Sequence, residues 1–471
     1  MTAYAPRMTR VLDSAQLARM HDAALAMLAR TGMKVDIEEM RIELARCPGF
    51  AVDGARVRIG EKPVQDWMAA FRQFHASQPP APALEIGRYT YHVSDRPTWI
   101  VDRDHVAVRP LLRQDAIEGA KLLHVLAAQG VQGVTPGVPT DVPSALQPME
   151  QFLIGAQYAG RGGQTCDVTD LRTARIIRDM NRVYGRELHM SAWCPSPLIF
   201  AGTEVDILWQ FRREIKGTMA GSMPIMGLTG PCDPIGIMTL AMAEAVGGAA
   251  ILHALLPGIP VSIFPHPEAA DMQTGCMVLG SPEWELLDLM HREVIEFYGG
   301  RWNMKMLHTT ASLPNAQVQI EHTTGALLGV LGGYTEFDAL GELALDQVWC
   351  PAQLLLDLDI VAHEARVARG AASGAGLELE RLPDIVDEVI REDMLFAAHE
   401  TTVANLRTQY HRPSLLQRLG RPQWTDAGMP SVLRAAQARV DELISTYSYE
   451  PPADILRELR AICDKAKTAL R

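Results

Sequence analysis

The stretch SMPIMGLTGPCDPIGIMTLAMAEAVGGAAILHALLPGIPVSIF (residues 222–264) decides the fold, because it contains a complete strand–helix–strand pattern. Its first run (222–228) and its last run (259–264) are apolar and short, which predicts buried strands. Between them, Asp233 is a suitable N-cap and Pro234 a favoured first residue for a long helix rich in Gly and Ala. Strands that alternate with helices in this way indicate a parallel sheet.

The same rhythm repeats along the chain. Seven apolar runs, each followed by a polar turn and a helical pattern, are VQGVTPG (131–137), GQTCDV (163–168), LHMSAWC (188–194), SMPIMGL (222–228), IPVSIF (259–264), RWNMKML (301–307) and GYTEFD (333–338). ALDQVW (344–349) is the best candidate for an eighth strand. This repetition favours an α/β fold of the (β/α)8 TIM-barrel type over an open doubly wound sheet. The chain has no GxGxxG turn that would support a dinucleotide fold.

The chain divides into three predicted regions. Residues 1–110 combine a helical pattern with short alternating strands, and we expect an N-terminal α+β extension. Residues 111–352 hold the repeating units and form the expected catalytic barrel. Residues 353–471 are mostly helical, with amphipathic segments at 433–447 and 453–470. This helical tail is expected to be a packed cap or a contact in a homo-oligomer.

Composition excludes several classes of partner. The 471 residues are 48% hydrophobic and 21% charged, and the net charge of −12 argues against nucleic-acid binding. No uninterrupted apolar run reaches about 18 residues and the N-terminus has no apolar signal core, so we expect a cytoplasmic protein without a membrane partner. Seven scattered cysteines with no CxxC pair argue against a disulfide framework or a structural metal site.

The turn that opens the quoted helix lies where barrel enzymes build their sites, at the carboxyl end of a strand. Thr229 and Gly230 could present backbone N–H groups to the mouth of the barrel. A tight strand-to-helix turn without a ligand explains the same residues equally well. The loop at 264–280 is long for a compact domain, which is typical of functional loops.

Several stretches resemble the trimethylamine methyltransferase family in the family's own order. They are LDSAQLARMHDAALAMLARTGMKVD, VDGARVRIGEKPVQDWM, TGPCDPIGIMTLAMAEAVGGAAILHALLPGIPV, GSPEWELLDLMHREVIEFYG, PNAQVQIEHTTGALLGVLGG and HETTVANLRTQYHRPSL. The resemblance covers nearly the whole chain. It implies a βα barrel that transfers a methyl group from an amine to the Co(I) ion of a corrinoid (cobalamin) on a separate small protein.

The resemblance also narrows the substrate. Trimethylamine-specific members carry pyrrolysine, which would fall near His308 to Ser312, and this chain has only standard residues there. It therefore resembles the branch that lacks pyrrolysine, some of whose members demethylate glycine betaine. A quaternary ammonium is already activated, because a neutral amine leaves when its methyl group is displaced. Such an enzyme needs positioning and water exclusion rather than a nucleophile or base of its own, so we assign no catalytic residue.

Aromatic faces are the usual binding surface for quaternary ammonium groups. Trp193, Phe264 and Phe337 are candidates for substrate binding because they are aromatic and lie at or near predicted strand ends. Trp302 and Tyr334 are further possibilities. Each of them could instead belong to the core.

Polar candidates follow the same strands. His266 and His308 could donate a hydrogen bond to a substrate carboxylate, or could be loop histidines in water. Glu321 could oppose the cation or pair with a neighbour, and alternative anions on the next strand are Glu336 and Asp338.

Two other functions remain open from the sequence. The same barrel could use tetrahydrofolate or free cobalamin as the methyl acceptor. It could also bind an onium compound without catalysis.

Overall fold

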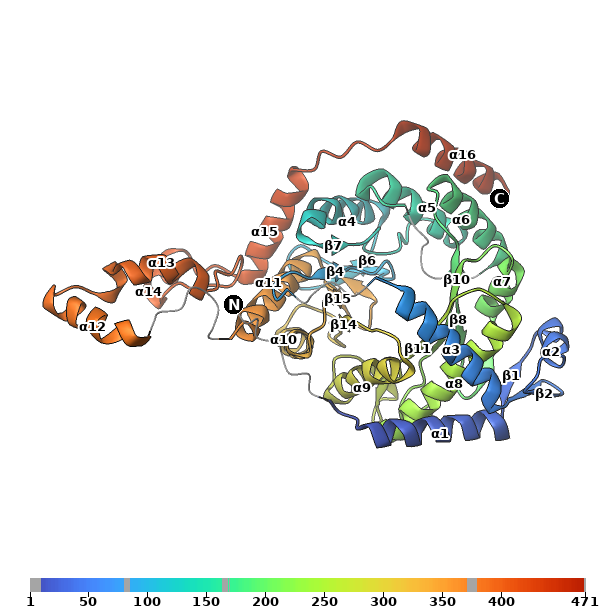
Figure 1. Cartoon of the computed structure of the whole chain (residues 1–471). Helices are drawn as coiled ribbons and strands as arrows, with labels where there is room; N and C mark the ends of the chain where they lie inside the picture. The colour runs from blue at the N-terminus through green and yellow to red at the C-terminus, as the bar shows by residue number, and fades with distance from the viewer. Residues whose placement is uncertain (1–9, 80–84, 163–167, 169, 371–378, 470–471) are drawn as a thin grey trace.

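The computed structural model describes residues 10–79, 85–162, 168, 170–370 and 379–469, which form a mixed α/β structure (Figure 1). Two parallel sheets lie around a common centre, and helices surround them (Figure 1). One sheet has the order β11-β10-β8 and the other the order β14-β15-β4-β7. Their strands are β4 (Thr90–His92), β7 (Val131–Gln132), β8 (His189–Cys194), β10 (Gly217–Ser222), β11 (Val261–Pro265), β14 (Met304–Met306) and β15 (Glu336–Asp338).

The predicted α/β class with parallel strands is confirmed. Hydrogen bonds among the described residues do not join β11 to β14 or β7 to β8, so they form two parallel sheets and no closed barrel. The predicted strand at 163–168 falls between β7 and β8 in the chain, and residues 163–167 lie outside the described part. The eight-stranded closure therefore stays a prediction.

Three details of the strand assignment differ from the prediction. Val348–Trp349, in the predicted eighth strand, forms β17 of a separate small sheet. Instead β4, which the prediction placed in the N-terminal extension, pairs in parallel with both β15 and β7. The strand predicted at 222–228 ends at Ser222, because the weakly apolar segment GTMAGS before it is the strand and Pro224 follows in the loop.

The Gly/Ala-rich helix α8 (Pro234–Leu255) begins as predicted, with Asp233 accepting a hydrogen bond from the Gly236 N–H at 2.6 Å. It is long and apolar enough to cross a membrane, but 89% of its most apolar window is buried inside the protein. Small residues allow this packing. A Cβ on Gly247 would lie 2.5 Å from Met33 Sδ, and one on Gly248 would lie 3.0 Å from Cys194 Sγ.

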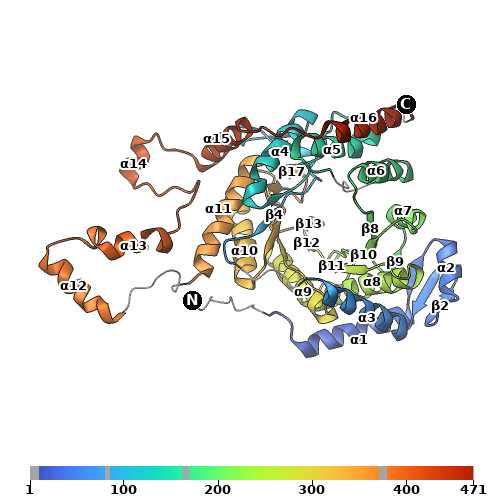
Figure 2. The same cartoon turned by 45° about the horizontal axis from the view of Figure 1, so that its top comes forward.

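An N-terminal layer covers α8 on its outer side (Figures 1 and 2). Trp67 Nε1 ties this layer to the parallel sheet by donating to the Val261 carbonyl at 3.0 Å. Its elements are α1 (Ser14–Arg30), β1 (Met33–Val35), α2 (Glu38–Leu44), β2 (Phe50–Asp53), β3 (Arg56–Ile59) and α3 (Glu61–Ser77). Strand β1 also pairs in parallel with β9 (Ile199–Phe200).

The remaining helices of the body are α4 (Arg113–Leu126), α5 (Gln147–Ile154), α6 (Leu171–Val183), α7 (Thr203–Phe211), α9 (Pro282–Tyr298), α10 (Ala316–Gly332) and α11 (Pro351–Ala368). The small sheet β16-β17-β5-β6 contains β5 (Trp99–Val101), β6 (Val108–Pro110), β16 (Glu342–Leu343) and β17, and a hairpin joins β12 (Ala269–Asp271) to β13 (Cys276–Val278).

The C-terminal region is helical, as predicted. It contains α12 (Leu382–Arg391), α13 (Glu400–Gln409), α14 (Arg421–Asp426), α15 (Val432–Ser445) and α16 (Ala453–Ala469). Helix α15 packs on α11 and α4, and α16 packs on α6 and α5. Helices α12 to α14 instead project sideways from the body (Figures 1 and 2).

Candidate functional site at the carboxyl ends of the parallel strands

Two predicted aromatic residues meet on the inner face of the three-stranded sheet. The registers of β8, β10 and β11 place Trp193, Gly221 and Phe264 side by side. The Trp193 and Phe264 rings lie 5.7 Å apart at 79°, and Trp302 lies 5.4 Å from Phe264. Gly221 is required between them, since a Cβ there would lie 2.5 Å from the Trp193 ring. Three ring systems thus line one inner surface.

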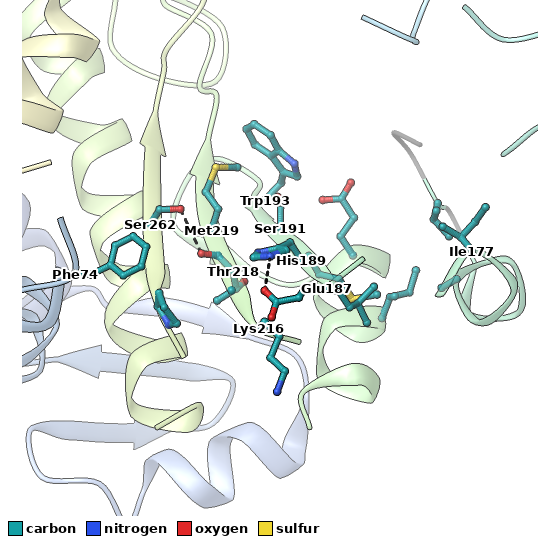
Figure 3. Close-up of a pocket in the computed structure, with 18 of the residues that line it drawn as sticks. Phe74, Ile177, Glu187, His189, Ser191, Trp193, Lys216, Thr218, Met219 and Ser262 are labelled. Atoms are coloured by element: carbon teal, nitrogen blue, oxygen red, sulfur yellow. Dashed lines mark hydrogen bonds and ion pairs between the residues drawn. The ribbon is translucent and has the colours of Figure 1, made fainter. Parts of the chain in front are cut away.

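A cavity of about 850 Å³ extends from Trp193 toward the amino ends of the strands (Figure 3). Ser191, Met219 and Ser262 line its inner part. Glu187 and Lys216 line the part remote from Trp193 (Figure 3). Of the charged groups described below, His266 and Glu268 follow the opposite, carboxyl end of β11, whereas Lys305 lies within β14 on the same face of its sheet as Phe337. Trp193 therefore borders both regions, and we place the candidate site where the aromatic rings meet those charged groups.

His266 lies in a buried charge cluster directly beyond β11, and not in water. Its Nδ1 is 3.1 Å from Glu268 Oε1 and its Nε2 is 3.1 Å from Asp288 Oδ1. Trp284 Nε1 donates to the other Glu268 oxygen at 2.6 Å. The ring of His266 stacks on Phe264 with 5.3 Å between centroids and 15° between planes. The cluster thus supports one of the aromatic faces from behind.

Lys305 extends this cluster from β14. Its Nζ lies 2.6 Å from both Glu285 and Asp288, and the Lys305 side chain is fully buried. Sequence reasoning missed Lys305, Glu268 and Asp288, although a lysine inside the apolar run RWNMKML and the His-Pro-Glu sequence after β11 were available signals. A buried lysine requires such carboxylate partners.

The charges in this cluster are set by pairing rather than by solvent. Burial alone would lower the pKa of His266, but Glu268 and Asp288 outweigh burial and raise this pKa to about 9. In the same way Asp288 and Glu285 raise the pKa of Lys305 above its usual value, against burial. Lys305 and His266 hold the pKa of Asp288 well below its usual range. The cluster contains three carboxyl groups and two basic groups, and burial raises the pKa of one of the carboxyl groups, Glu285, although Lys305 acts to lower it.

His308 is also buried and paired. Its Nδ1 is 2.9 Å from Asp346 Oδ1, and its ring lies 5.1 Å from Trp284 in an edge-on arrangement. Burial lowers the pKa of His308, but Asp346 outweighs burial and raises it. Glu342 is buried nearby and accepts from the Ser94 N–H at 2.7 Å. Burial and the charge of Asp346 raise the Glu342 pKa well above its usual value.

The inner face of the four-stranded sheet carries another pair that the sequence analysis did not identify. His92 Nε2 on β4 lies 2.9 Å from Glu336 Oε2 on β15. The hydrogen bond from His92 lowers the pKa of Glu336. His92 was missed because the strand that carries it was assigned to the N-terminal extension. The sequence analysis named Glu336 as an alternative anion to oppose the substrate cation. In the structure its carboxylate is paired with His92 of the neighbouring strand.

Phe337 lies in the core and away from this inner face. Its neighbours Glu336 and Asp338 are half-buried while Phe337 itself is fully buried. Its ring packs on Tyr89 at 5.2 Å and on Tyr91 at 6.3 Å. The alternation of a strand puts neighbouring residues on opposite faces, so the structure gives Phe337 a packing role.

The remaining predicted site residues form local contacts. The Thr229 and Gly230 N–H groups both donate to the Ile225 carbonyl, at 3.0 and 3.3 Å, so they are used within the turn instead of facing the mouth. Glu321 accepts one hydrogen bond from Thr309 Oγ1 and another from Gln317 Nε2 at 3.0 Å. Glu321 therefore braces the segment that follows His308.

Comparison with known proteins decides the family. The model of the family described as trimethylamine methyltransferase (MTTB) matches residues 3–470. The chain belongs to the trimethylamine methyltransferase family. This confirms the resemblance drawn from the sequence.

Individual relatives are distant from this member of the trimethylamine methyltransferase family. The chain is 25% identical to trimethylamine methyltransferase MttB1 of Methanosarcina acetivorans over 74% of this chain and 68% of that protein. It is 20% identical to glycine betaine methyltransferase of Desulfitobacterium hafniense over 94% of this chain and 93% of that protein. The crystal structure of the monomethylamine methyltransferase MtmB of Methanosarcina barkeri aligns with 99% of this chain and 88% of that chain, at 12% identity and a TM-score of 0.47.

Proposed function

We propose that the protein transfers a methyl group from a quaternary ammonium compound, with glycine betaine as the first candidate, to the cobalt of a corrinoid held by a separate protein. The family match and the near full-length similarity to a glycine betaine methyltransferase support a methyl transfer of this kind. The observation that carries the substrate class is the inner surface formed by Trp193, Phe264 and Trp302. Aromatic faces attract cations that cannot donate hydrogen bonds.

The chemistry is an in-line displacement. The bond between nitrogen and the methyl carbon breaks, and nitrogen keeps the electron pair and leaves as a neutral tertiary amine. The reduced cobalt of the acceptor supplies the electron pair for the new bond to carbon. No proton moves, so the chain needs no general base, and its contribution is to orient the substrate and exclude water.

The contacts of the described residues support a role for the chain in orienting the substrate. Gly221 leaves room for the Trp193 ring to stand beside Phe264. His266 stacks behind Phe264 and supports that ring. Asp346 holds Nδ1 of His308, so Nε2 is the ring nitrogen proposed to reach a substrate carboxylate.

The test is spectroscopic. Purified protein is mixed with reduced cob(I)alamin, alone or on a corrinoid protein, and with glycine betaine, proline betaine, carnitine or trimethylamine. We expect loss of the Co(I) band with at least one quaternary amine, none with trimethylamine, and at least about tenfold slower transfer in Trp193→Ala at subsaturating substrate. Methyl transfer to tetrahydrofolate in the absence of a corrinoid would contradict the proposal that cobalt is the methyl acceptor. Onium binding without any transfer would contradict catalysis.

A further inference from the structure

The projecting segment of residues 379–431, which we call the arm, carries an unusual amount of exposed apolar surface (Figures 1 and 2). Its side chains of this kind expose between 36% and 77% of their area. They are Leu379, Leu382, Ile390, Leu395, Phe396, Val403, Leu406, Tyr410, Leu416, Leu419, Trp424 and Met429. Few apolar side chains of the arm are buried; two of them, Ile385 and Val389, lie on α12.

The exposed area is large enough for a stable interface. At about 200 Å² for a large side chain, the arm presents on the order of 1,000 Å² of apolar surface. A typical monomer has a largest apolar patch of about 300–600 Å². A standard interface buries about 800 Å² on each partner. Summed over all its faces, the arm's exposed apolar area is larger than one such patch and of the same order as the area that a standard interface buries on one partner.

The arm is fixed to the body at its base. Asp359 on α11 is 4% exposed, and its carboxylate accepts hydrogen bonds from the backbone of Ser414, Leu415 and Leu416 at 2.8 to 3.1 Å. Arg366, also on α11, donates to the Gln409 carbonyl at 2.7 and 3.0 Å. These bonds hold the arm in the orientation that leaves its apolar side chains in solvent.

Charge divides the arm into two unlike halves. Residues 379–400 contain seven acidic side chains and two basic ones, whereas residues 401–431 contain four arginines and one aspartate. Both halves carry exposed apolar residues. Two arms related by a twofold axis would place the acidic half of each on the basic half of the other. Such a self-complementary pattern is what an isologous interface requires.

We propose that the arm is a dimerisation element that packs against the arm of a second copy of this chain, with acidic half on basic half. A corrinoid protein fits this surface less well. The arm extends sideways from the two parallel sheets in Figure 1, whereas the proposed methyl acceptor would approach the carboxyl ends of their strands. The inference does not depend on the proposed function.

Sedimentation velocity of the full chain tests the apolar part. We expect the wild type at twice the 51.7 kDa chain mass and Leu395→Glu at the single-chain mass. Leu395 is 77% exposed, so the substitution should not unfold the chain. The variant should therefore keep the circular dichroism spectrum of the wild type. Ile42→Glu, on α2 at the far side of the molecule, is the matched control and should stay dimeric (Figure 1). A monomeric wild type, or a dimer unaffected by Leu395→Glu, would overturn the proposal.

Charge reversal tests the pairing and identifies the partner. One variant carries Asp384→Arg with Asp387→Arg, and the other carries Arg407→Glu with Arg412→Glu; all four side chains are exposed. Each variant alone should sediment as a monomer, because like charges then face one another. An equimolar mixture should recover dimers, which only contact between two copies of the chain can produce. Failure of the mixture to recover them would overturn the acid-on-basic arrangement.

Discussion

His266 should make the stability of this protein depend on pH in a predictable direction. Its pKa is raised from 6.5 to about 9 in the folded chain, where Glu268 and Asp288 contact both ring nitrogens. A raised pKa adds stability that is fully present below about pH 6.5 and is lost as pH rises through about 9. The difference of about 2.5 units corresponds to about 3 kcal/mol at roughly 1.4 kcal/mol per unit.

Urea unfolding at intervals between pH 6.5 and 9.5, followed by tryptophan fluorescence, measures this slope. Over that range the wild type should lose about 3 kcal/mol more unfolding free energy than His266→Gln does. Other titratable groups near His266 do not produce this difference between the two proteins. Lys305 stays charged and His291, with a pKa of about 3, stays neutral throughout this pH range. His308 is present in both proteins and so contributes equally to both slopes. His253→Gln, a half-buried histidine on α8, is the control. Equal slopes in His266→Gln and wild type would refute the reasoning.

Three further predictions follow from contacts near the same strands. Lys305→Met should lower the unfolding free energy at pH 7 by about 3–5 kcal/mol, measured by urea titration, because it leaves Glu285 buried without its cation and Asp288 with His266 alone. Gly221→Ala should raise KM at least severalfold in the Co(I) assay, since the new Cβ would displace the Trp193 ring; an unchanged KM would contradict that geometry. Glu244→Leu should lower the melting temperature by several degrees, because it removes the acceptor of buried hydrogen bonds from the Leu198 N–H, just before β9, and from Ser222 Oγ at the end of β10, worth about 1–3 kcal/mol.

The sequence predicts the order of strands and helices well where one apolar run is followed by one capped helix. The segment from β10 through α8 to β11 is such a case, because Asp233 and Pro234 mark the helix start without tertiary information. The boundary of β10 was misplaced because the strand consists largely of small residues and does not form a strongly apolar run. One of them, Gly221, is needed because the Trp193 ring packs against it, and this contact is seen only in the three-dimensional structure.

The candidate site could be predicted only in part. Trp193 and Phe264 were proposed because both lie at or near the ends of apolar runs; the parallel register brings them side by side, and their role in binding stays a prediction. Phe337 was assigned to the site although it faces the core, since a shift of one position on a strand reverses the face. His92 was missed because its short strand returns from the N-terminal region to pair with β15. Such long-range pairing has no local signal.

The most direct test of the aromatic site is a calorimetric titration with tetramethylammonium, which carries the cation without a carboxylate. The wild type should bind it, and Trp193→Ala should bind at least about tenfold more weakly, as expected for the loss of a cation–π contact. Trp99→Ala is the matched control, because Trp99 is 41% exposed on the small sheet and should not affect binding. Equal affinity in Trp193→Ala and wild type would contradict the claim that this inner surface holds the onium group.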